Sequence, residues 1–136
     1  MRVIADTGFI VAFIRERDTH HGWAKAIAET ITAPALTCEA VLAEAAFHLM
    51  DVEITLALID RGLLKLAFSV EQHRQELLLL AKRYSDREPD LADLCLIRMS
   101  EIHPKHGVLT VDRADFAVYR RNKNQRIPCV FPPEKQ

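Results

Sequence analysis

Four acidic residues lie in stretches of the sequence that are otherwise apolar, which is an unusual setting for a carboxylate. Asp6 is the only charged residue in the segment 3–14, and Glu44 lies within EAVLAEAAFHLM. Asp93 lies within LADLCLI, and Asp112 ends the segment VLTVD. An ionised carboxylate that is isolated in apolar surroundings costs several kcal/mol, so each of these side chains needs a compensating partner.

A single bound divalent cation would compensate all four carboxylates at once. Hard ions such as Mg²⁺ and Mn²⁺ prefer oxygen ligands, and carboxylates are their usual protein ligands. Clustered carboxylates repel one another and tend to become protonated, whereas a doubly charged cation keeps them ionised. The pattern therefore predicts a metal site built by Asp6, Glu44, Asp93 and Asp112.

Each acid also has a simpler explanation when it is considered alone. Asp6 is a candidate N-cap at a turn from strand to helix, and Asp112 is a candidate for an Asx-turn with the residues after it. Glu44 can extend from the edge of a helix or pair with an arginine, and Asp93 can cap a helix or form an ion pair. These simpler explanations require a different local partner for each of the four acids, whereas one bound cation would account for all of them.

The elements that must position these acids alternate between strands and helices. Strands are predicted at 2–6, 33–38, within 63–70, at 107–112 and at 127–131, where short segments are rich in apolar and β-branched residues. Helices are predicted at 9–15, from a cap at Asp18 to about 30, and at 39–50, 52–61 (stopped by Gly62), 71–84, 90–102 and 114–121. This alternation predicts an α/β domain with a mainly parallel sheet.

Parallel strands end at one edge of their sheet, and ligands bind outside that edge. Asp6 ends the first predicted strand and Asp112 ends the fourth, so we expect both side chains at this edge. The sequence shows no repeat, linker or change of composition, and we therefore predict a single domain that spans residues 1–136.

The composition favours a cytoplasmic protein with one core. The chain has 136 residues, 49 % of them apolar, and no apolar run is long enough to span a membrane. The N-terminal segment lacks the features of a signal peptide. Cys38, Cys95 and Cys129 lie far apart among apolar residues, and we expect them to be reduced packing residues.

The net charge of −1 conceals a basic C-terminal region. Basic side chains outnumber acidic ones from Arg113 onward, which is compatible with a surface that meets phosphates and equally with a solvated end of a helix. The candidate RNA-binding residues are Arg113, Arg120, Arg121, Lys123 and Arg126.

Four segments of the chain resemble the successive motifs of PIN-domain proteins, most closely the VapC-like ribonuclease toxins of bacterial toxin–antitoxin pairs. They are ADTGFIVAFIRERDTHH, LTCEAVLAEAAFHL, PDLADLCLIRMSE and VLTVDRADFAVYR. The resemblance implies a five-stranded sheet of order 3-2-1-4-5 flanked by helices, and a metal-dependent ribonuclease site. The four acids of the family match Asp6, Glu44, Asp93 and Asp112, and a further acid of some members matches Asp115.

The resemblance also implies roles for these residues in cleaving an RNA phosphodiester with one or two Mg²⁺ or Mn²⁺ ions. Asp6 is expected to be the central metal ligand, with Asp93 and Asp112 completing the ligand set and Glu44 holding a water or acting as general base. The hydroxyl groups of Thr7 and Thr110 are expected to orient the carboxylates. Asp90 lies one helical turn before Asp93 and is either a further acid of the site or a helix N-cap.

The partners expected from this resemblance are RNA, a second copy of the chain and a small antitoxin protein. The main alternative is a PIN domain that binds RNA or a partner without cleaving. A phosphoryl-transfer domain is a second alternative, although the sequence has no second acid beside Asp6 and no lysine directly after VLTVD. A third is a structural module in which the acids pair with arginines such as Arg98 and Arg113.

Overall fold

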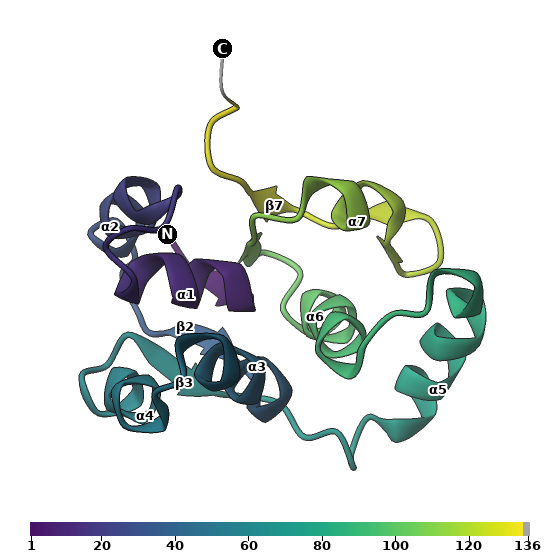
Figure 1. Cartoon of the computed structure of the whole chain (residues 1–136). Helices are drawn as coiled ribbons and strands as arrows, with labels where there is room; N and C mark the ends of the chain where they lie inside the picture. The colour runs from purple at the N-terminus through teal and green to yellow at the C-terminus, as the bar shows by residue number, and fades with distance from the viewer. Residues whose placement is uncertain (135–136) are drawn as a thin grey trace.

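The computed structural model, which describes residues 1–134, contains a parallel five-stranded sheet with helices packed around it (Figure 1). The strands are β1 (Val3–Ala5), β2 (Ala35–Thr37), β3 (Leu64–Leu66), β4 (Gly107–Leu109) and β7 (Cys129–Val130), in the order β3-β2-β1-β4-β7. The predicted α/β fold and strand order are confirmed, because β7 is the fifth strand of this sheet. Residues 135–136 of the predicted domain lie outside the described residues.

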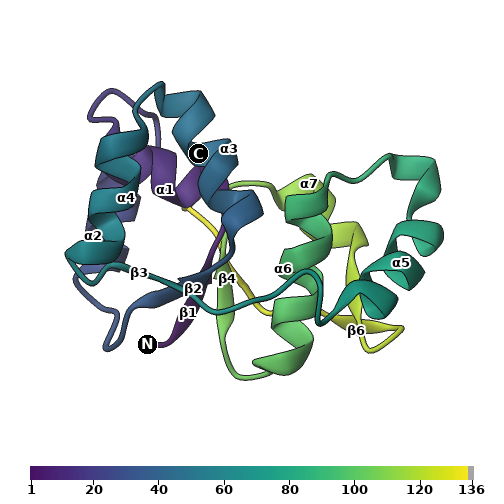
Figure 2. The same cartoon turned by 90° about the horizontal axis from the view of Figure 1, so that it is seen from below.

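The helices are α1 (Thr7–Ile14), α2 (His21–Ala28), α3 (Glu39–Leu49), α4 (Val52–Asp60), α5 (Arg74–Arg83), the 3₁₀ turn η1 (Ser85–Arg87), α6 (Leu91–Ile102) and α7 (Arg113–Val118). Helix α6 contacts both β1 and β4, and α5 packs on the outer side of α6 (Figures 1 and 2). Helices α3 and α4 pack side by side next to β2 and β3 (Figure 2). Among the described residues, no helix has the length and apolar character that crossing a membrane requires.

The apolar residues of β1 and of the helices around it form the core. All three residues of β1 are buried, as are Phe9 and Ile10 of α1 and the segment 94–97 of α6. Because β1 is the central strand, neighbours cover both of its edges and helices pack against it, so a continuous apolar run is expected there.

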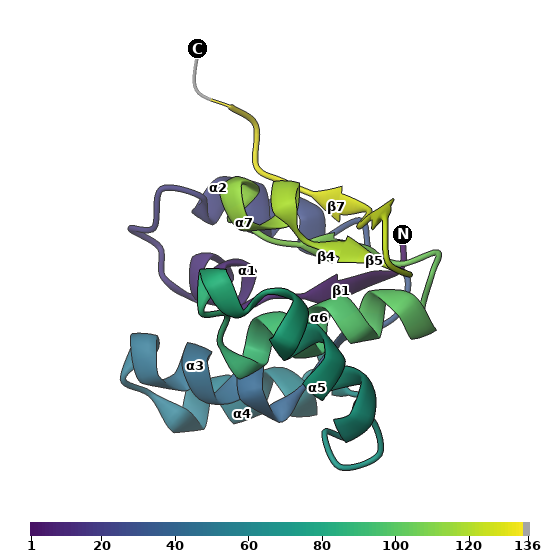
Figure 3. The same cartoon turned by 90° about the vertical axis from the view of Figure 1, so that its right-hand side faces the viewer.

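The register of β1 and β4 brings two of the predicted acids to one edge. Ala5 pairs with Leu109, and the backbone N–H of Asp6 donates to the Leu109 carbonyl at 3.0 Å. The chain therefore leaves β1 at Asp6 and leaves β4 just before Asp112 at the same end of the sheet. Figure 3 shows β7, β4 and β1 following one another across the sheet.

The helix predicted at 114–121 is wrong in its second half. Helix α7 ends at Val118, and the next residues form an antiparallel hairpin of β5 (Arg120–Arg121) and β6 (Gln125–Arg126). Asn122 and Lys123 have φ angles of 48° and 76°, so the chain turns back there instead of continuing as a helix.

Helix boundaries differ elsewhere by a few residues. The predicted helix at 71–84 begins only at Arg74, and α1 begins at Thr7 rather than at residue 9. The Asp18 side chain accepts a hydrogen bond from the His20 N–H at 2.8 Å, so it shapes the loop before α2 and is not the N-cap of that helix. Gly62, with φ of 80°, follows α4 as predicted.

Candidate active site

A polar cleft with a volume of about 340 Å³ contains all four of the predicted acids. Asp6 follows β1, Glu44 lies on α3, Asp93 lies in the first turn of α6, and Asp112 precedes α7. Segments far apart in the sequence therefore contribute acids to one cavity. The cleft is lined by Asp6, Thr7, Gly8, Val11, Arg15, Asp18, His20, Glu44, His48, Asp90, Asp93, Val111, Asp112 and Asp115.

Both carboxylate oxygens of Asp6 accept hydrogen bonds from the protein. Oδ1 accepts from the Thr7 backbone N–H at 2.6 Å, so Asp6 is the N-cap of α1, and Oδ2 accepts from the Thr110 hydroxyl at 2.7 Å. Burial raises the pKa of Asp6 to about 6, and the negative charges of Glu44 and Asp112 add to this effect. The two hydrogen bonds lower the pKa and only partly oppose the burial.

Glu44 is connected to the start of α1 through Thr7. The Thr7 hydroxyl donates to Oε2 of Glu44 at 3.0 Å, which ties α3 to the segment that carries Asp6. Partial burial raises the pKa of Glu44, and the nearby carboxylate of Asp90 raises it further. None of the ion pairs within residues 1–134 joins Glu44 to an arginine, which disfavours that simpler explanation for its position.

Asp93 has the most strongly raised pKa among the carboxylates of the cleft. Burial raises the pKa to about 7, opposed in part by a hydrogen bond of 2.8 Å that Oδ2 accepts from the Tyr119 hydroxyl. Asp90 caps α6 by accepting from the Asp93 backbone N–H at 2.8 Å. Asp90 is therefore a helix N-cap that also lines the cleft, so both predicted roles remain compatible with its position.

Asp112 immediately precedes α7, and Asp115 lies in the first turn of that helix. Oδ1 of Asp112 accepts from the Asp115 N–H at 2.9 Å, which makes Asp112 the N-cap of this helix. Burial raises the pKa of Asp112, whereas the Arg87 guanidinium, 2.8 Å from Asp115, lowers the pKa of Asp115. Asp115 thus has a local positive partner, and Asp112 has none among the described ion pairs.

The chemistry of these side chains suits a hard divalent cation. Every candidate ligand offers carboxylate oxygen, and within residues 1–134 no lysine or arginine forms an ion pair with any of the four acids. Burial is the main cause of the raised pKa values of Asp6 and Asp93, and neighbouring carboxylates add to it, which a doubly charged cation would reverse. Within the same residues, no three His, Cys, Asp or Glu side chains lie close enough together to form a ready-made metal-binding group.

The arginines that a structural-module hypothesis would pair with the acids have other partners. Arg98 bridges Glu76 and Glu101, and Arg113 pairs with Glu134 and donates to the Pro132 carbonyl at 2.6 Å. Neither arginine reaches the cleft acids among the described ion pairs, which disfavours that hypothesis.

The candidate RNA-binding residues lie in different environments. Arg121 is only 4 % exposed, and its guanidinium donates to the carbonyls of Ser100 and Pro104, so it is unsuited to contact RNA. Lys123 and Arg126 are exposed on the hairpin. The Arg113 guanidinium lies 4.6 Å from the centre of the Phe131 ring, and Arg120 donates to nearby backbone carbonyls.

Three cleft neighbours were not singled out by sequence reasoning. Tyr119 contacts Asp93, Arg87 pairs with Asp115, and Arg15 lines the cleft while donating to the His48 carbonyl at 2.6 Å. The spacing of Tyr119 from Phe116 in the sequence predicts a packing residue and does not indicate the contact with Asp93. The sequence shows only that Tyr119 lies seven residues after Asp112, which is too weak a pattern to predict a contact with the site.

Comparison with known proteins supports the fold and the kind of site. A family model described as the PIN domain matches residues 3–122, which is most of the chain. A comparison with curated proteins finds no match. Because the family model covers this much of the chain, the chain belongs to the PIN domain family, whose members are generally metal-dependent nucleases.

Proposed function

We propose that this protein is a metal-dependent endoribonuclease that acts in the cytoplasm as the toxin of a toxin–antitoxin pair. The observation that carries the nuclease part is the gathering of Asp6, Glu44, Asp93 and Asp112 in one cleft, where no lysine or arginine of residues 1–134 pairs with them. The toxin part rests on the resemblance of its motifs to VapC-like proteins.

Asp6, Asp93 and Asp112 are the residues that would hold the metal. One or two Mg²⁺ or Mn²⁺ ions bound there would supply positive charge that activates water and stabilises the phosphate and the leaving oxygen. Thr110 holds Oδ2 of Asp6, and the Thr7 N–H holds Oδ1, so the central carboxylate is oriented before any ligand arrives. The products expected for the family are a 3′-hydroxyl and a 5′-phosphate.

Glu44 is the proposed general base. Its raised pKa makes the carboxylate a stronger proton acceptor than an ordinary glutamate, and the Thr7 hydroxyl holds one of its oxygens at 3.0 Å. In this role Glu44 accepts a proton from the attacking water while Thr7 keeps the side chain directed at the cleft.

The proposed RNA-contacting surface is the exposed part of the basic C-terminal region. Lys123 and Arg126 on the hairpin form no side-chain hydrogen bond or ion pair within residues 1–134, and both are exposed. Arg113 and Arg120 are secondary candidates because protein groups already occupy part of each guanidinium. Arg121 is left out of this surface because it is buried.

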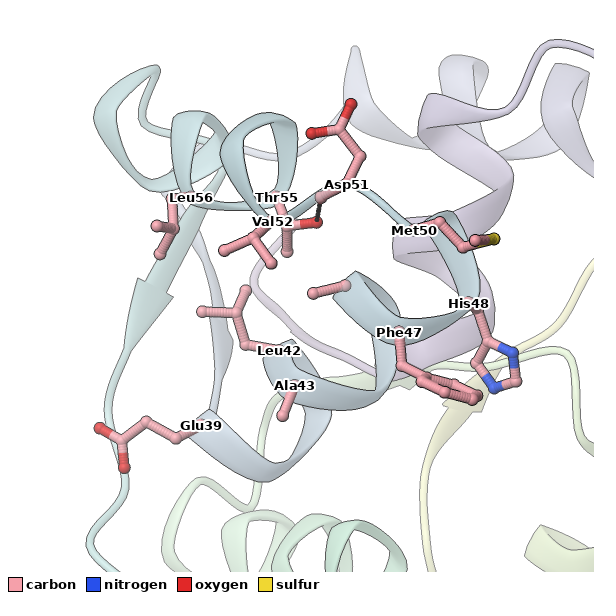
Figure 4. Close-up of a pocket in the computed structure, with 11 residues that line it drawn as sticks. Glu39, Leu42, Ala43, Phe47, His48, Met50, Asp51, Val52, Thr55 and Leu56 are labelled. Carbon is pink, nitrogen blue, oxygen red and sulfur yellow. Dashed lines mark hydrogen bonds between the residues drawn. The ribbon is translucent and has the colours of Figure 1, made fainter.

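An apolar groove between α3 and α4 is the proposed docking site for a segment of an antitoxin (Figure 4). Its volume is about 980 Å³, and exposed apolar side chains line it, including Phe47 (77 %), Met50 (92 %) and Val52 (63 %). Apolar patches of this kind usually mark interaction sites. Glu39 and Asp51 also line the groove, so a segment with apolar side chains flanked by basic ones would complement it.

The proposed surface for pairing with a second copy is the outer face of α5. Leu77 and Leu80 are buried against the core, whereas Leu78 and Leu79 are 60 % and 66 % exposed. Of the four consecutive leucines at 77–80, two therefore belong to the core and two lie on the surface. Analytical ultracentrifugation of the wild type and of Leu79→Lys tests this assignment, and a monomeric wild type would contradict it.

The nuclease proposal is tested by incubating the protein with a panel of structured and unstructured RNAs. We expect cleavage with Mn²⁺, no cleavage with EDTA, and a loss of cleavage in Asp93→Asn and Glu44→Gln. Ends can be mapped to check for 5′-phosphates. A wild type that binds these RNAs tightly in Mn²⁺ and leaves them intact would favour the alternative of a non-cleaving RNA-binding module.

The toxin proposal is tested by looking for a small open reading frame beside the gene and co-expressing its product. We expect a complex that forms with the wild type and is lost in Phe47→Glu, while RNA cleavage by Phe47→Glu is unchanged. A product that binds Phe47→Glu as tightly as wild type would exclude the groove as its docking site.

A further inference from the structure

Tyr119 is a buried residue whose only polar side-chain atom contacts an acid of the cleft. The residue is 1 % exposed, and its hydroxyl donates to Oδ2 of Asp93 at 2.8 Å. Its ring packs edge-on against Tyr84 and Phe116, with ring centres 5.1 and 5.5 Å apart. Phenylalanine would satisfy the packing, so the hydroxyl needs a separate explanation.

The position of Tyr119 links two acid-bearing segments of the site. Tyr119 follows α7 directly, and its backbone N–H donates to the Asp115 carbonyl at 3.0 Å. Asp112 caps the other end of the same helix, whereas Asp93 lies on α6. The hydroxyl contact therefore sets α7, with its two acids, against the first turn of α6.

The contact also restricts the carboxylate itself. The outer torsion of an aspartate side chain has a broad energy profile, so an untethered carboxylate rotates over a wide range. Tyr119 holds Oδ2, and no side-chain or backbone group within residues 1–134 donates to Oδ1. One oxygen is thus fixed by the protein and the other is left for a ligand.

We propose that Tyr119 is a positioning residue, which presents Oδ1 of Asp93 to a divalent cation by holding Oδ2. This inference rests on the proposed function only in requiring that the cleft binds such a cation. Groups that orient metal ligands in this way typically contribute about 10- to 100-fold in metal affinity or activity.

The test measures Mn²⁺ affinity in the absence of RNA, by the EPR signal of free Mn²⁺. We expect Tyr119→Phe to bind Mn²⁺ about tenfold more weakly than the wild type. Tyr84→Phe is the matched control, because it removes a hydroxyl from the same aromatic cluster that contacts Arg120 and none of the acids. We expect its Mn²⁺ affinity to stay within about twofold of wild type.

A double-mutant cycle separates positioning from a general loss of structure. If Tyr119 acts through Asp93, Tyr119→Phe has no further effect on Mn²⁺ affinity in the Asp93→Asn background. An equal loss of Mn²⁺ affinity in both backgrounds, or a wild-type affinity in Tyr119→Phe, overturns the inference.

If Tyr119→Phe does not fold, the hydroxyl proton of Tyr119 in the wild type provides a second measurement. NMR should show it as a slowly exchanging signal that moves on addition of diamagnetic Mg²⁺, and a signal unmoved by saturating Mg²⁺ overturns the inference.

Failure of the nuclease proposal gives a different result. A wild type that binds Mn²⁺ and cleaves no RNA contradicts the proposed function, and the difference between Tyr119→Phe and Tyr84→Phe in Mn²⁺ affinity still supports the inference. Where cleavage is present, we expect excess Mn²⁺ to restore most of the rate of Tyr119→Phe. A wild type without any Mn²⁺ affinity overturns both.

Discussion

Helix α3 borders two cavities that differ in size and in chemistry. It contributes Glu44 to the acidic cleft of about 340 Å³, and Ala43 and Phe47 to the apolar groove of about 980 Å³, while His48 lines both. The smaller cavity holds four acids that form no ion pair with a lysine or arginine of residues 1–134, and the larger one is lined mostly by apolar side chains. The comparison suggests that the cleft is suited to chemistry because it holds carboxylates without a basic partner in fixed positions. The groove is suited to binding another protein because its apolar side chains are exposed.

The largest expected difference between the two regions is in catalysis. Asp6→Asn should lower Mn²⁺-dependent RNA cleavage by about 100-fold or more, since it removes the charge of the central carboxylate. Phe47→Ala in the groove should leave the cleavage rate within about twofold, because its side chain is exposed and touches no acid. Initial rates of cleavage of one RNA compare the two variants, and full activity of Asp6→Asn would remove Asp6 from the proposed site.

Without metal, substitutions in the acidic cleft and in the apolar groove should differ in how their effect on the free energy of unfolding depends on pH. The pKa values of Asp6 and Asp93 are raised to about 6 and about 7 in the folded protein. Between about pH 4 and pH 7 these two carboxyls therefore bind more protons in the folded state than in the unfolded state, and their contribution to the free energy of unfolding falls as the pH rises. Asp6→Asn should recover about 1 to 2 kcal/mol at pH 8.

Urea denaturation in EDTA at pH 5 and at pH 8 measures this effect. Phe47→Ser in the groove is the control and should change stability by less than about 0.5 kcal/mol at either pH. If Asp6→Asn gains no stability relative to the wild type between pH 5 and pH 8, burial does not penalise the ionised Asp6 carboxylate.

An added methyl group should destabilise the protein more beside the cleft than at the open surface. A Cβ added at Gly8 would lie 2.5 Å from Cγ2 of Val111, in the loop that leads to Asp112, whereas a Cβ at Gly22 meets no atom within 4 Å. Gly8→Ala should cost about 1 to 3 kcal/mol, and Gly22→Ala should be neutral or stabilising by up to about 1 kcal/mol. Thermal denaturation compares them, and Val111→Ala should restore much of the stability of Gly8→Ala.

The smallest expected effect concerns salt. Lys123→Gln removes one exposed charge of the proposed RNA surface, so the slope of log affinity against log salt should fall by about 0.7. Binding of an uncharged apolar peptide in the α3–α4 groove should be nearly independent of salt. Fluorescence anisotropy with a labelled single-stranded RNA gives the slope, and an unchanged slope would place the RNA elsewhere.

Much of the fold was predictable because its signals are local. The apolar run at 3–5 and the Gly62 stop are properties of short segments and predicted their elements correctly, whereas the strand order was implied by the resemblance to PIN-domain proteins. The hairpin after α7 was missed, because the positive φ angles of Asn122 and Lys123 have no strong sequence signal without a glycine. Arg121 was misplaced for the same reason, since the hairpin turns its side chain inward.

The sequence by itself determined that four acids lie in apolar segments and that two of them, Asp6 and Asp112, follow strands of a parallel sheet, although β4 ends at Leu109 and not at Asp112 as predicted. Only the tertiary structure decided that Glu44 and Asp93 join them, that Tyr119 holds Asp93, and that Phe47 and Met50 remain exposed. The physical reason is that, when nearly all residues of a helix are apolar, the sequence does not indicate which face of the helix packs against its neighbours. The burial that raises the pKa values of these acids likewise arises only when distant segments pack together.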